Sequence, residues 1–170
     1  MSCIKSDSLE LAIELENKGH EYYKKHAAEA ENPLAKRVLE SLASQELDHI
    51  ETIKKISAGQ CIADVDYQIT DVEDEVKDVF KSFSKKEREG WKDTNVDVYQ
   101  HALDLEEDIY NLYKELAQKT DDESEKKFFE DMMEQEMNHY ESIENVYNYF
   151  NNPGDWFATE ESKVWPWMNT

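Results

Sequence analysis

The chain has 170 residues, a formal net charge of −21, only four glycines and three prolines, and two cysteines. So strong a negative charge argues against binding to nucleic acid or to an anionic membrane surface. No stretch of the sequence approaches the roughly 20 apolar residues that a membrane-spanning helix needs. The charge itself has two interpretations, a solvated acidic surface or an attraction for cations.

The two cysteines, Cys3 and Cys61, form neither a disulfide framework nor a Cys-x-x-Cys metal motif. The first ten residues lack the apolar run of a signal peptide. We therefore expect a protein of the reducing cytoplasm, with enough residues for one domain and a substantial core.

Amphipathic patterns predict four long helices and therefore an all-α fold. The first helix spans about 7–30, and the second begins at Pro33 and ends near residue 57. The third spans about 95–119, and the fourth is capped by Asp121 and runs to about residue 150. The two hairpin connections are short, so the helices of each pair should be antiparallel.

The segment 59–94 is long enough to cross a bundle from one end to the other. It contains a capping-box pattern at Ser84 and Glu87 and a small apolar helical face at Val76, Val79, Phe80 and Phe83. Residues 1–150 should therefore form the bundle with this crossover. The remaining tail, 151–170, is aromatic enough that we expect it to pack on the bundle or on a partner subunit, and we expect a homodimer.

The chain repeats itself when position n is aligned with position n+90, without a gap. A shared register over two long segments indicates a duplicated helical hairpin. The matched pairs include Ala12 and Ala102, Glu16 and Glu106, Tyr23 and Tyr113, Gln45 and Gln135, Glu46 and Glu136, and His49 and His139.

Polar residues interrupt the apolar stripe of each helix near its middle. No lysine or arginine lies on these stripes, and a desolvated carboxylate without a partner costs several kcal/mol. Three remedies are open: protonated glutamates, a water-filled cavity, or bound metal. Two divalent cations would balance four carboxylates and leave both histidines neutral. The interrupting residues are Glu16, Glu46, His49, Glu106, Glu136 and His139.

One glutamate from each of two helices, with Glu-x-x-His from each of the other two, is typical of dimetal carboxylate bundles. Iron or manganese suits these ligands, and zinc is possible. The segments that carry the pattern resemble the rubrerythrin branch of the ferritin-like superfamily, over about residues 7–150. They are 12–16, 45–49, 102–106 and 135–139.

The resemblance implies a ferritin-like antiparallel four-helix bundle with one long crossover between its second and third helices. It also implies two irons bridged by Glu46 and Glu136, with Glu16 and Glu106 as terminal ligands and one histidine, His49 or His139, on each iron. The implied activity is reduction of peroxide or dioxygen, or oxidation of ferrous iron, in oxidative-stress defence. The alternatives are an iron-storage or delivery protein with little turnover, and an interaction module with a vestigial site.

Two departures from the family pattern affect these expectations. Rubrerythrins carry a rubredoxin-like domain with Cys-x-x-Cys motifs, which these 170 residues lack, so we expect an external electron donor such as a rubredoxin-like protein. They also carry an extra glutamate one turn after the ligand of the third helix. Ile109 stands at that position, and its repeat mate is Gly19.

Six further residues on or beside the stripes are candidates to support the ligands. His20 lies one turn from Glu16, and it is either a donor to the ligands or an ordinary core histidine with its hydrogen bonds satisfied. Tyr23, Tyr110 and Tyr113 are candidates to donate hydrogen bonds to ligand carboxylates, or else core aromatic residues. Asp48 and Asn138 occupy equivalent places and either orient a histidine or face solvent.

Overall fold

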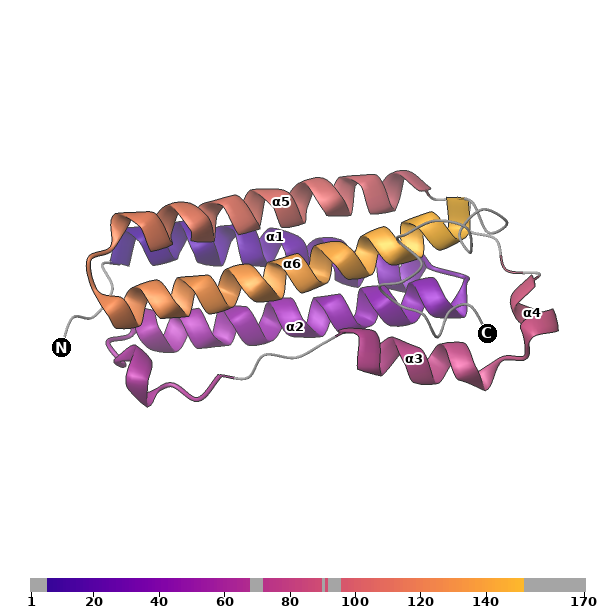
Figure 1. Ribbon diagram of the computed structural model, residues 1–170, viewed down its shortest axis with the longest axis horizontal. Coiled ribbons are helices and arrows are strands. Elements are labelled where there is room, and N and C mark those ends of the chain that lie inside the picture. The colour runs from indigo at the N-terminus through magenta and orange to yellow at the C-terminus, as the bar shows by residue number, and fades with distance from the viewer. Residues whose placement is uncertain (1–5, 68–71, 90, 92–95, 152–170) are drawn as a thin grey trace.

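The computed structural model describes residues 6–67, 72–89, 91 and 96–151, and within them it is helical and without strands. Four long helices form the bundle: α1 (Ser6–Glu29), α2 (Pro33–Ser57), α5 (Val96–Lys119) and α6 (Glu123–Asn151). Helices α1 and α2 make one antiparallel hairpin and α5 and α6 the other (Figure 1). Because α1 packs beside α5 and α2 beside α6, the predicted four-helix bundle is confirmed.

The starts of the helices follow from local chemistry. Asn32 caps α2, because its side-chain oxygen accepts the backbone N–H groups of Leu34 (2.9 Å) and Ala35 (3.0 Å), and Pro33 occupies the first turn as predicted. The predicted cap of α6 was wrong by one residue. Asp122, not Asp121, accepts the N–H groups of Ser124 and Glu125, at 2.9 and 3.1 Å.

The crossover contains a short 3₁₀ turn, η1 (Ile62–Asp64), and two helices, α3 (Val72–Ser82) and α4 (Lys85–Glu89). The predicted capping box is present: the Ser84 N–H donates to Glu87 (2.7 Å) and the Glu87 N–H to the Ser84 hydroxyl (3.3 Å). Of the predicted apolar face, Val76 and Phe80 are buried, whereas Val79 and Phe83 are half-buried.

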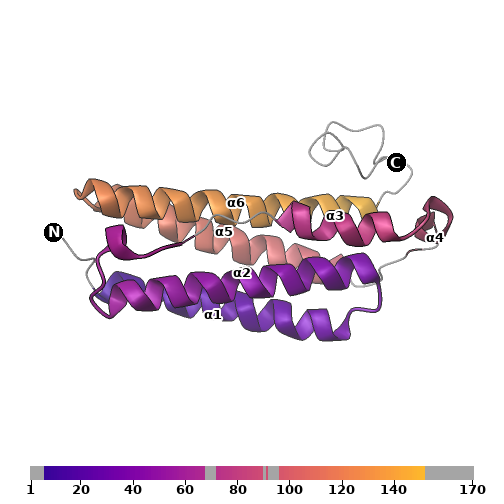
Figure 2. The same ribbon diagram turned by 90° about the horizontal axis from the view of Figure 1, so that it is seen from below.

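The crossover covers the face formed by α2 and α6. The turn η1 packs on α6 at one end, and α3 packs on α2 and α6 towards the other (Figure 2). Residues 68–71 and the predicted aromatic tail, from 152 onwards, lie outside the described residues. Within the described residues, none of the helices combines the length and the apolar character that crossing a bilayer would require.

The core consists of two hydrophobic clusters at opposite ends of the bundle. One surrounds Leu34, Leu42 and Val146, and the other surrounds Leu9, Ile53 and Phe128. Along every long helix, the residues of the two clusters flank the predicted polar positions. The polar residues therefore form a buried layer between two apolar blocks, which shields them from water on both sides along the bundle axis.

Candidate metal centre

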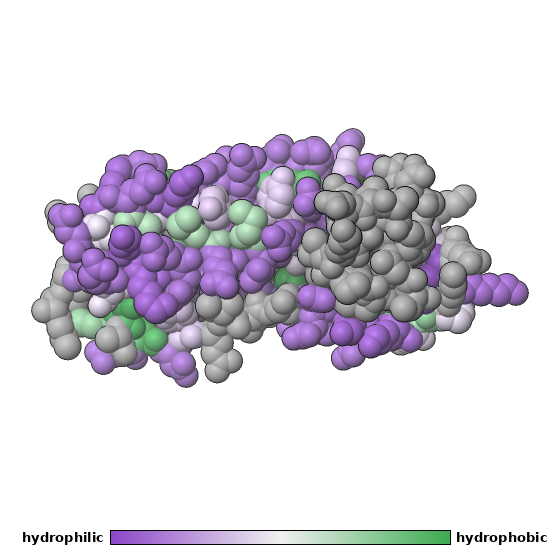
Figure 3. All heavy atoms as spheres, in the orientation of Figure 1, coloured by the Kyte–Doolittle hydropathy of each residue, from purple (hydrophilic) through white to green (hydrophobic). Residues whose placement is uncertain are grey.

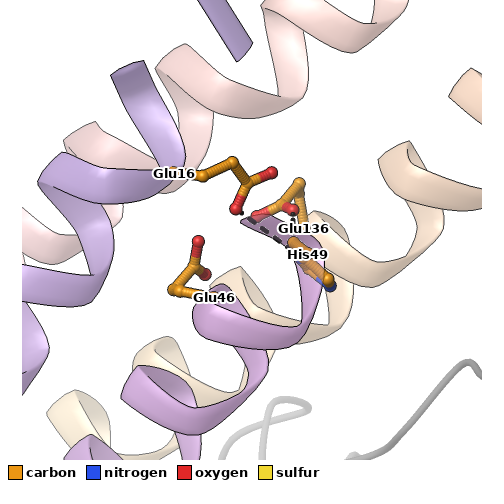
Figure 4. A group of neighbouring side chains, drawn as sticks. All are labelled: Glu16, Glu46, His49 and Glu136. Carbon is orange, nitrogen blue, oxygen red and sulfur yellow. Dashed lines mark hydrogen bonds and ion pairs between the residues drawn. The ribbon is translucent and has the colours of Figure 1, made fainter. Parts of the chain in front are cut away.

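The structure brings together all six residues that interrupt the helical stripes. His49 is 4% exposed and the other five are fully buried. Each long helix contributes to the cluster, because the polar positions lie at the same height in the bundle. Figure 4 shows Glu16 from α1, Glu46 and His49 from α2, and Glu136 from α6 pointing towards a common space. The complete cluster is Glu16, Glu46, His49, Glu106, Glu136 and His139.

The cluster divides into two groups that could each hold a metal ion, with ligand atoms within 4.8 Å of one another in each group. Two glutamates, Glu46 and Glu136, belong to both groups. The first group adds one glutamate and one histidine, and the second adds their repeat mates. The members are Glu16, Glu46, His49 and Glu136, and Glu46, Glu106, Glu136 and His139.

Both histidines direct Nδ1 into the cluster. His49 Nδ1 lies 3.0 Å from Glu136 and 3.2 Å from Glu16. His139 Nδ1 lies 2.9 Å from Glu46, 3.4 Å from Glu136 and 3.5 Å from Glu106. The two rings stack with centroids 5.4 Å apart and an interplanar angle of 12°. Each imidazole therefore offers the same nitrogen to the carboxylates, from the α2–α6 side.

Two glutamines fix the other nitrogen of each ring. His49 Nε2 donates to the side-chain oxygen of Gln135, and His139 Nε2 donates to that of Gln45, both at 2.8 Å. An amide oxygen only accepts hydrogen bonds, so Nε2 carries the proton and a neutral ring keeps its Nδ1 lone pair towards the cluster. These glutamines are 3% exposed or less.

Sequence reasoning did not assign this role to Gln45 and Gln135, although both were part of the repeat. Their position directly before each metal-ligand candidate, in the pattern Gln-Glu-x-x-His, was the signal available. Of the residues considered instead, Asp48 is exposed and Asn138 is half-buried.

Two of the predicted supporting tyrosines contact the cluster and cross between the hairpins. The hydroxyl of Tyr23 on α1 donates to Glu106 on α5, and that of Tyr113 on α5 donates to Glu16 on α1. Burial, followed by repulsion from the glutamates, raises the pKa of both phenols well above its usual value. Both therefore remain hydrogen-bond donors at neutral pH.

The other two candidates lie elsewhere. His20 is half-buried, and its Nδ1 lies 2.7 Å from the backbone oxygen of Ala43, which links α1 to α2. His20 is therefore the second of the two predicted alternatives, a histidine whose hydrogen bond is satisfied outside the cluster. Its Nδ1 bonds to a backbone carbonyl and not to a ligand carboxylate. Tyr110 is also half-buried and lines a cavity between α5 and α6.

Without metal, the cluster must share protons. Burial raises the pKa of Glu46 well above its usual value, and the charges of Glu16 and Glu136 raise it further. Burial also raises the pKa of Glu106, to about 7, although His139 opposes the shift. Burial would likewise raise the pKa of Glu136, but His49 and His139 hold it below its usual value.

In the metal-free cluster, protonated histidines would partly balance the carboxylates, which the sequence analysis did not predict. Burial disfavours the imidazolium form, yet Glu16 and Glu136 raise the pKa of His49 well above its usual value. Glu106 has the same effect on His139. Burial is the main cause of the raised pKa values of Glu46 and Glu106, and the negative charge that two imidazoliums cannot balance adds to it.

The orphaned atoms in the cluster test whether these residues fit a metal. Both oxygens of Glu46 and Glu136, one oxygen of Glu106, and Nδ1 of His139 lack a partner in hydrogen-bonding geometry within the described residues. The carboxylate oxygens are pure acceptors when deprotonated, and Nδ1 of His139 is an acceptor when the ring is neutral. Divalent cations would satisfy them together, and the mixed carboxylate and imidazole donor set suits iron, manganese or zinc.

An acidic cavity of about 310 Å³ reaches the outer side of this centre. It lies between α2, α6 and the start of the crossover, and its walls include His49 and Gln135. Three acidic residues also line it, with one lysine: Asp48, Glu51, Asp66 and Lys55. The cavity connects the surface with the side of the centre that carries His49.

The fold and this centre define a helical-bundle protein with a buried carboxylate and histidine site able to hold metal. The family model described as Rubrerythrin matches residues 7–147. The chain belongs to the rubrerythrin family, a ferritin-like diiron-carboxylate family. No curated protein and no solved structure matches the chain significantly.

Proposed function

We propose that this chain is a non-haem diiron oxidoreductase, which reduces peroxide or dioxygen at a carboxylate-bridged pair of irons. The observation that carries the proposal is the sharing of Glu46 and Glu136 by two four-residue ligand groups. A single metal would need only one group. Two overlapping groups support two ions held side by side, with the shared carboxylates between them.

Each residue has a defined part in this proposal. Glu46 and Glu136 would bridge, Glu16 and Glu106 would each bind one ion, and His49 and His139 would bind through Nδ1. When bound, two ferrous ions would supply the two electrons that, with two protons, reduce hydrogen peroxide to two water molecules. The hydroxyls of Tyr23 and Tyr113 hold the terminal carboxylates in place.

Turnover then requires an external reductant, and a rubredoxin-like protein is our candidate. The protein would act in oxidative-stress defence, as a cytoplasmic homodimer.

One observation favours the second candidate function, an iron-storage or delivery protein with little turnover. Ile109 is 1% exposed and packs in a hydrophobic cluster with Leu112 and Phe129. It cannot supply the additional carboxylate that the family resemblance leads us to expect there. Iron binding without fast peroxide reduction would agree with this difference.

Anaerobic titration with Fe(II), followed by stopped-flow mixing with peroxide, tests the proposal. We expect two irons per chain and ferric absorption that develops faster than the oxidation of free iron, with one peroxide consumed per two irons. Many irons per chain would favour storage. Fewer than two, or oxidation no faster than in solution, would refute the proposal.

A matched pair of variants on α6 makes the test specific. Glu136→Gln removes a shared carboxylate and should abolish binding of both ions. Glu134→Gln makes the same chemical change at an exposed position on the same helix and should bind two irons.

A further inference from the structure

A second cavity, of about 220 Å³, lies between α5 and α6. Its walls include two residues of the candidate metal centre, Glu106 and Glu136, and three residues of larger, less polar side chains, Tyr110, Met137 and Tyr140. Met137 is 39% exposed, whereas the two glutamates are fully buried. The cavity therefore leads from the surface and ends against the cluster.

The character of this cavity differs from that of the acidic cavity beside His49. Two phenol rings and a thioether line it, together with the exposed Glu107 and Asn111. Figure 3 shows weakly hydrophobic side chains along the seam between α5 and α6, bordered by hydrophilic ones. An apolar wall favours an uncharged ligand. Glu107 at the same cavity, together with the anionic cluster, disfavours an anion.

The corresponding seam of the other hairpin is built differently. The repeat mates of Tyr110 and Tyr140 are His20 and Ile50. His20 bonds to the Ala43 backbone and so ties α1 to α2, and Ile50 is 1% exposed. Tyr110 makes no such bond to α6 within the described part of the chain. The two halves of a repeated fold thus differ at the positions that would admit a small molecule.

We propose that the α5–α6 cavity is the route by which a small uncharged molecule with an O–O bond, either dioxygen or a hydroperoxide, reaches the metal centre. The inference rests on the proposed diiron function. Small side-chain motions of Met137 and Tyr110, of the kind that partly exposed residues make on fast timescales, complete the path.

Nitric oxide is a suitable probe, because it is small, uncharged and gives an absorption change on binding ferrous iron. The Met137→Trp variant fills the mouth of the cavity. Its second-order rate constant for nitric oxide binding, measured by anaerobic stopped flow, should fall at least about tenfold below that of the wild type. The iron content should remain unchanged.

The repeat provides a matched control. Leu47 is the mate of Met137 and is 42% exposed, against 39% for Met137. The Leu47→Trp variant adds the same bulk to the α1–α2 seam and should leave the rate within about twofold of the wild type. The Met137→Ala variant widens the mouth and should bind nitric oxide at least as fast as the wild type.

Each contrary result has a separate meaning. An unchanged rate in Met137→Trp, an equal loss in Leu47→Trp, or a loss in Met137→Ala would overturn the proposed route while leaving the diiron function in place. Slower uptake of Fe(II) without slower binding of nitric oxide would also overturn it, since the cavity would then admit the cation. A wild-type protein that binds no iron would instead refute the proposed function.

Discussion

Tyr23 and Glu106 lie on different hairpins, and the hydrogen bond between them joins these hairpins at the centre of the bundle. The repeat supplies the reciprocal bond from Tyr113 to Glu16. Each hairpin therefore positions a buried carboxylate of the other. This reciprocity makes the geometry of the candidate metal centre depend on the packing of α1 against α5.

Replacing Tyr23 by phenylalanine should weaken metal binding without unfolding the protein. The variant keeps the buried ring but leaves Glu106 without its donor, and loss of such a supporting bond typically costs about 10–100-fold in metal affinity. Calorimetric titration with Co(II) or anaerobic Fe(II) measures the change. The Tyr22→Phe variant is the control, because the Tyr22 hydroxyl bonds to the Val98 carbonyl (2.7 Å) instead of the cluster.

The glutamines allow a second test of the supporting structure. In the Gln135→Ala variant, His49 loses the acceptor of its Nε2 proton and with it a fixed ring orientation, so metal affinity should fall by about 10–100-fold. Gln45→Ala should do the same through His139. The exposed Asp48→Ala variant should bind metal as tightly as the wild type. Equal losses in Asp48→Ala and Gln45→Ala would contradict the assignment of the glutamines.

The metal-free protein should lose stability as the pH rises. The raised pKa of Glu106, about 7 against an ordinary 4.5, means that this group stabilises the fold fully below about pH 4.5 and loses that contribution by about pH 7. Glu46, His49 and His139 also have raised pKa values and act in the same direction, with the histidines losing their contribution above about pH 6.5. Glu136, whose pKa is lowered, contributes stability above its ordinary 4.5 and loses it only in stronger acid.

Thermal melts in chelator between about pH 5.5 and pH 8 measure this trend, and the midpoint should fall by several degrees. With saturating metal the stabilisation should grow with pH, because binding displaces protons from the same groups. The Glu106→Gln variant removes one of these groups and should flatten the slope. A metal-free midpoint that rises over this range would contradict the pKa shifts.

Gly19 on α1 leaves space for a shared carboxylate. A Cβ atom at this position would lie 3.2 Å from Oε2 of Glu46, closer than ordinary van der Waals contact, and 3.4 Å from its Cδ. The Gly19→Ala variant should gain up to about 1 kcal/mol from helix propensity in the metal-free state. Its metal affinity should nevertheless fall, on the order of tenfold, because Glu46 must shift.

Parallel urea denaturation and metal titration separate the two effects of Gly19→Ala. Lys18→Ala changes the neighbouring exposed residue and should alter neither quantity by much. Metal binding by Gly19→Ala as tight as that of the wild type would contradict this prediction. It would mean that the Glu46 side chain can move away from the added methyl group without losing its position in the metal centre.

The sequence predicted the fold and the cluster because both depend on periodicity. The four helices, the antiparallel pairing and the convergence of the interrupting residues follow from stripes at helical spacing and from the repeat. Pro33 and the pair of Ser84 and Glu87 are local signals, and the structure confirms their predicted positions. By contrast, Asp121 and Asp122 are adjacent acids, and only the loop geometry decides which one caps α6.

The histidine supports could not be predicted in the same way. Gln45 and Asp48 both lie beside the stripe of α2, and their burial depends on how closely α6 approaches. The long crossover adds a second uncertainty, since no periodicity determines the path of η1 and α3 over α2 and α6. The two cavities result from that path and from the different seams of the hairpins, so they emerge only with the tertiary structure.

The buried layer has a consequence for the origin of this architecture. Neither hairpin holds a full set of ligands, since each provides one lone glutamate and one Glu-x-x-His pair. Two identical half-length chains, related by a two-fold axis, would supply the complete donor set. Metal ions bound between two such chains would hold them together as a dimer.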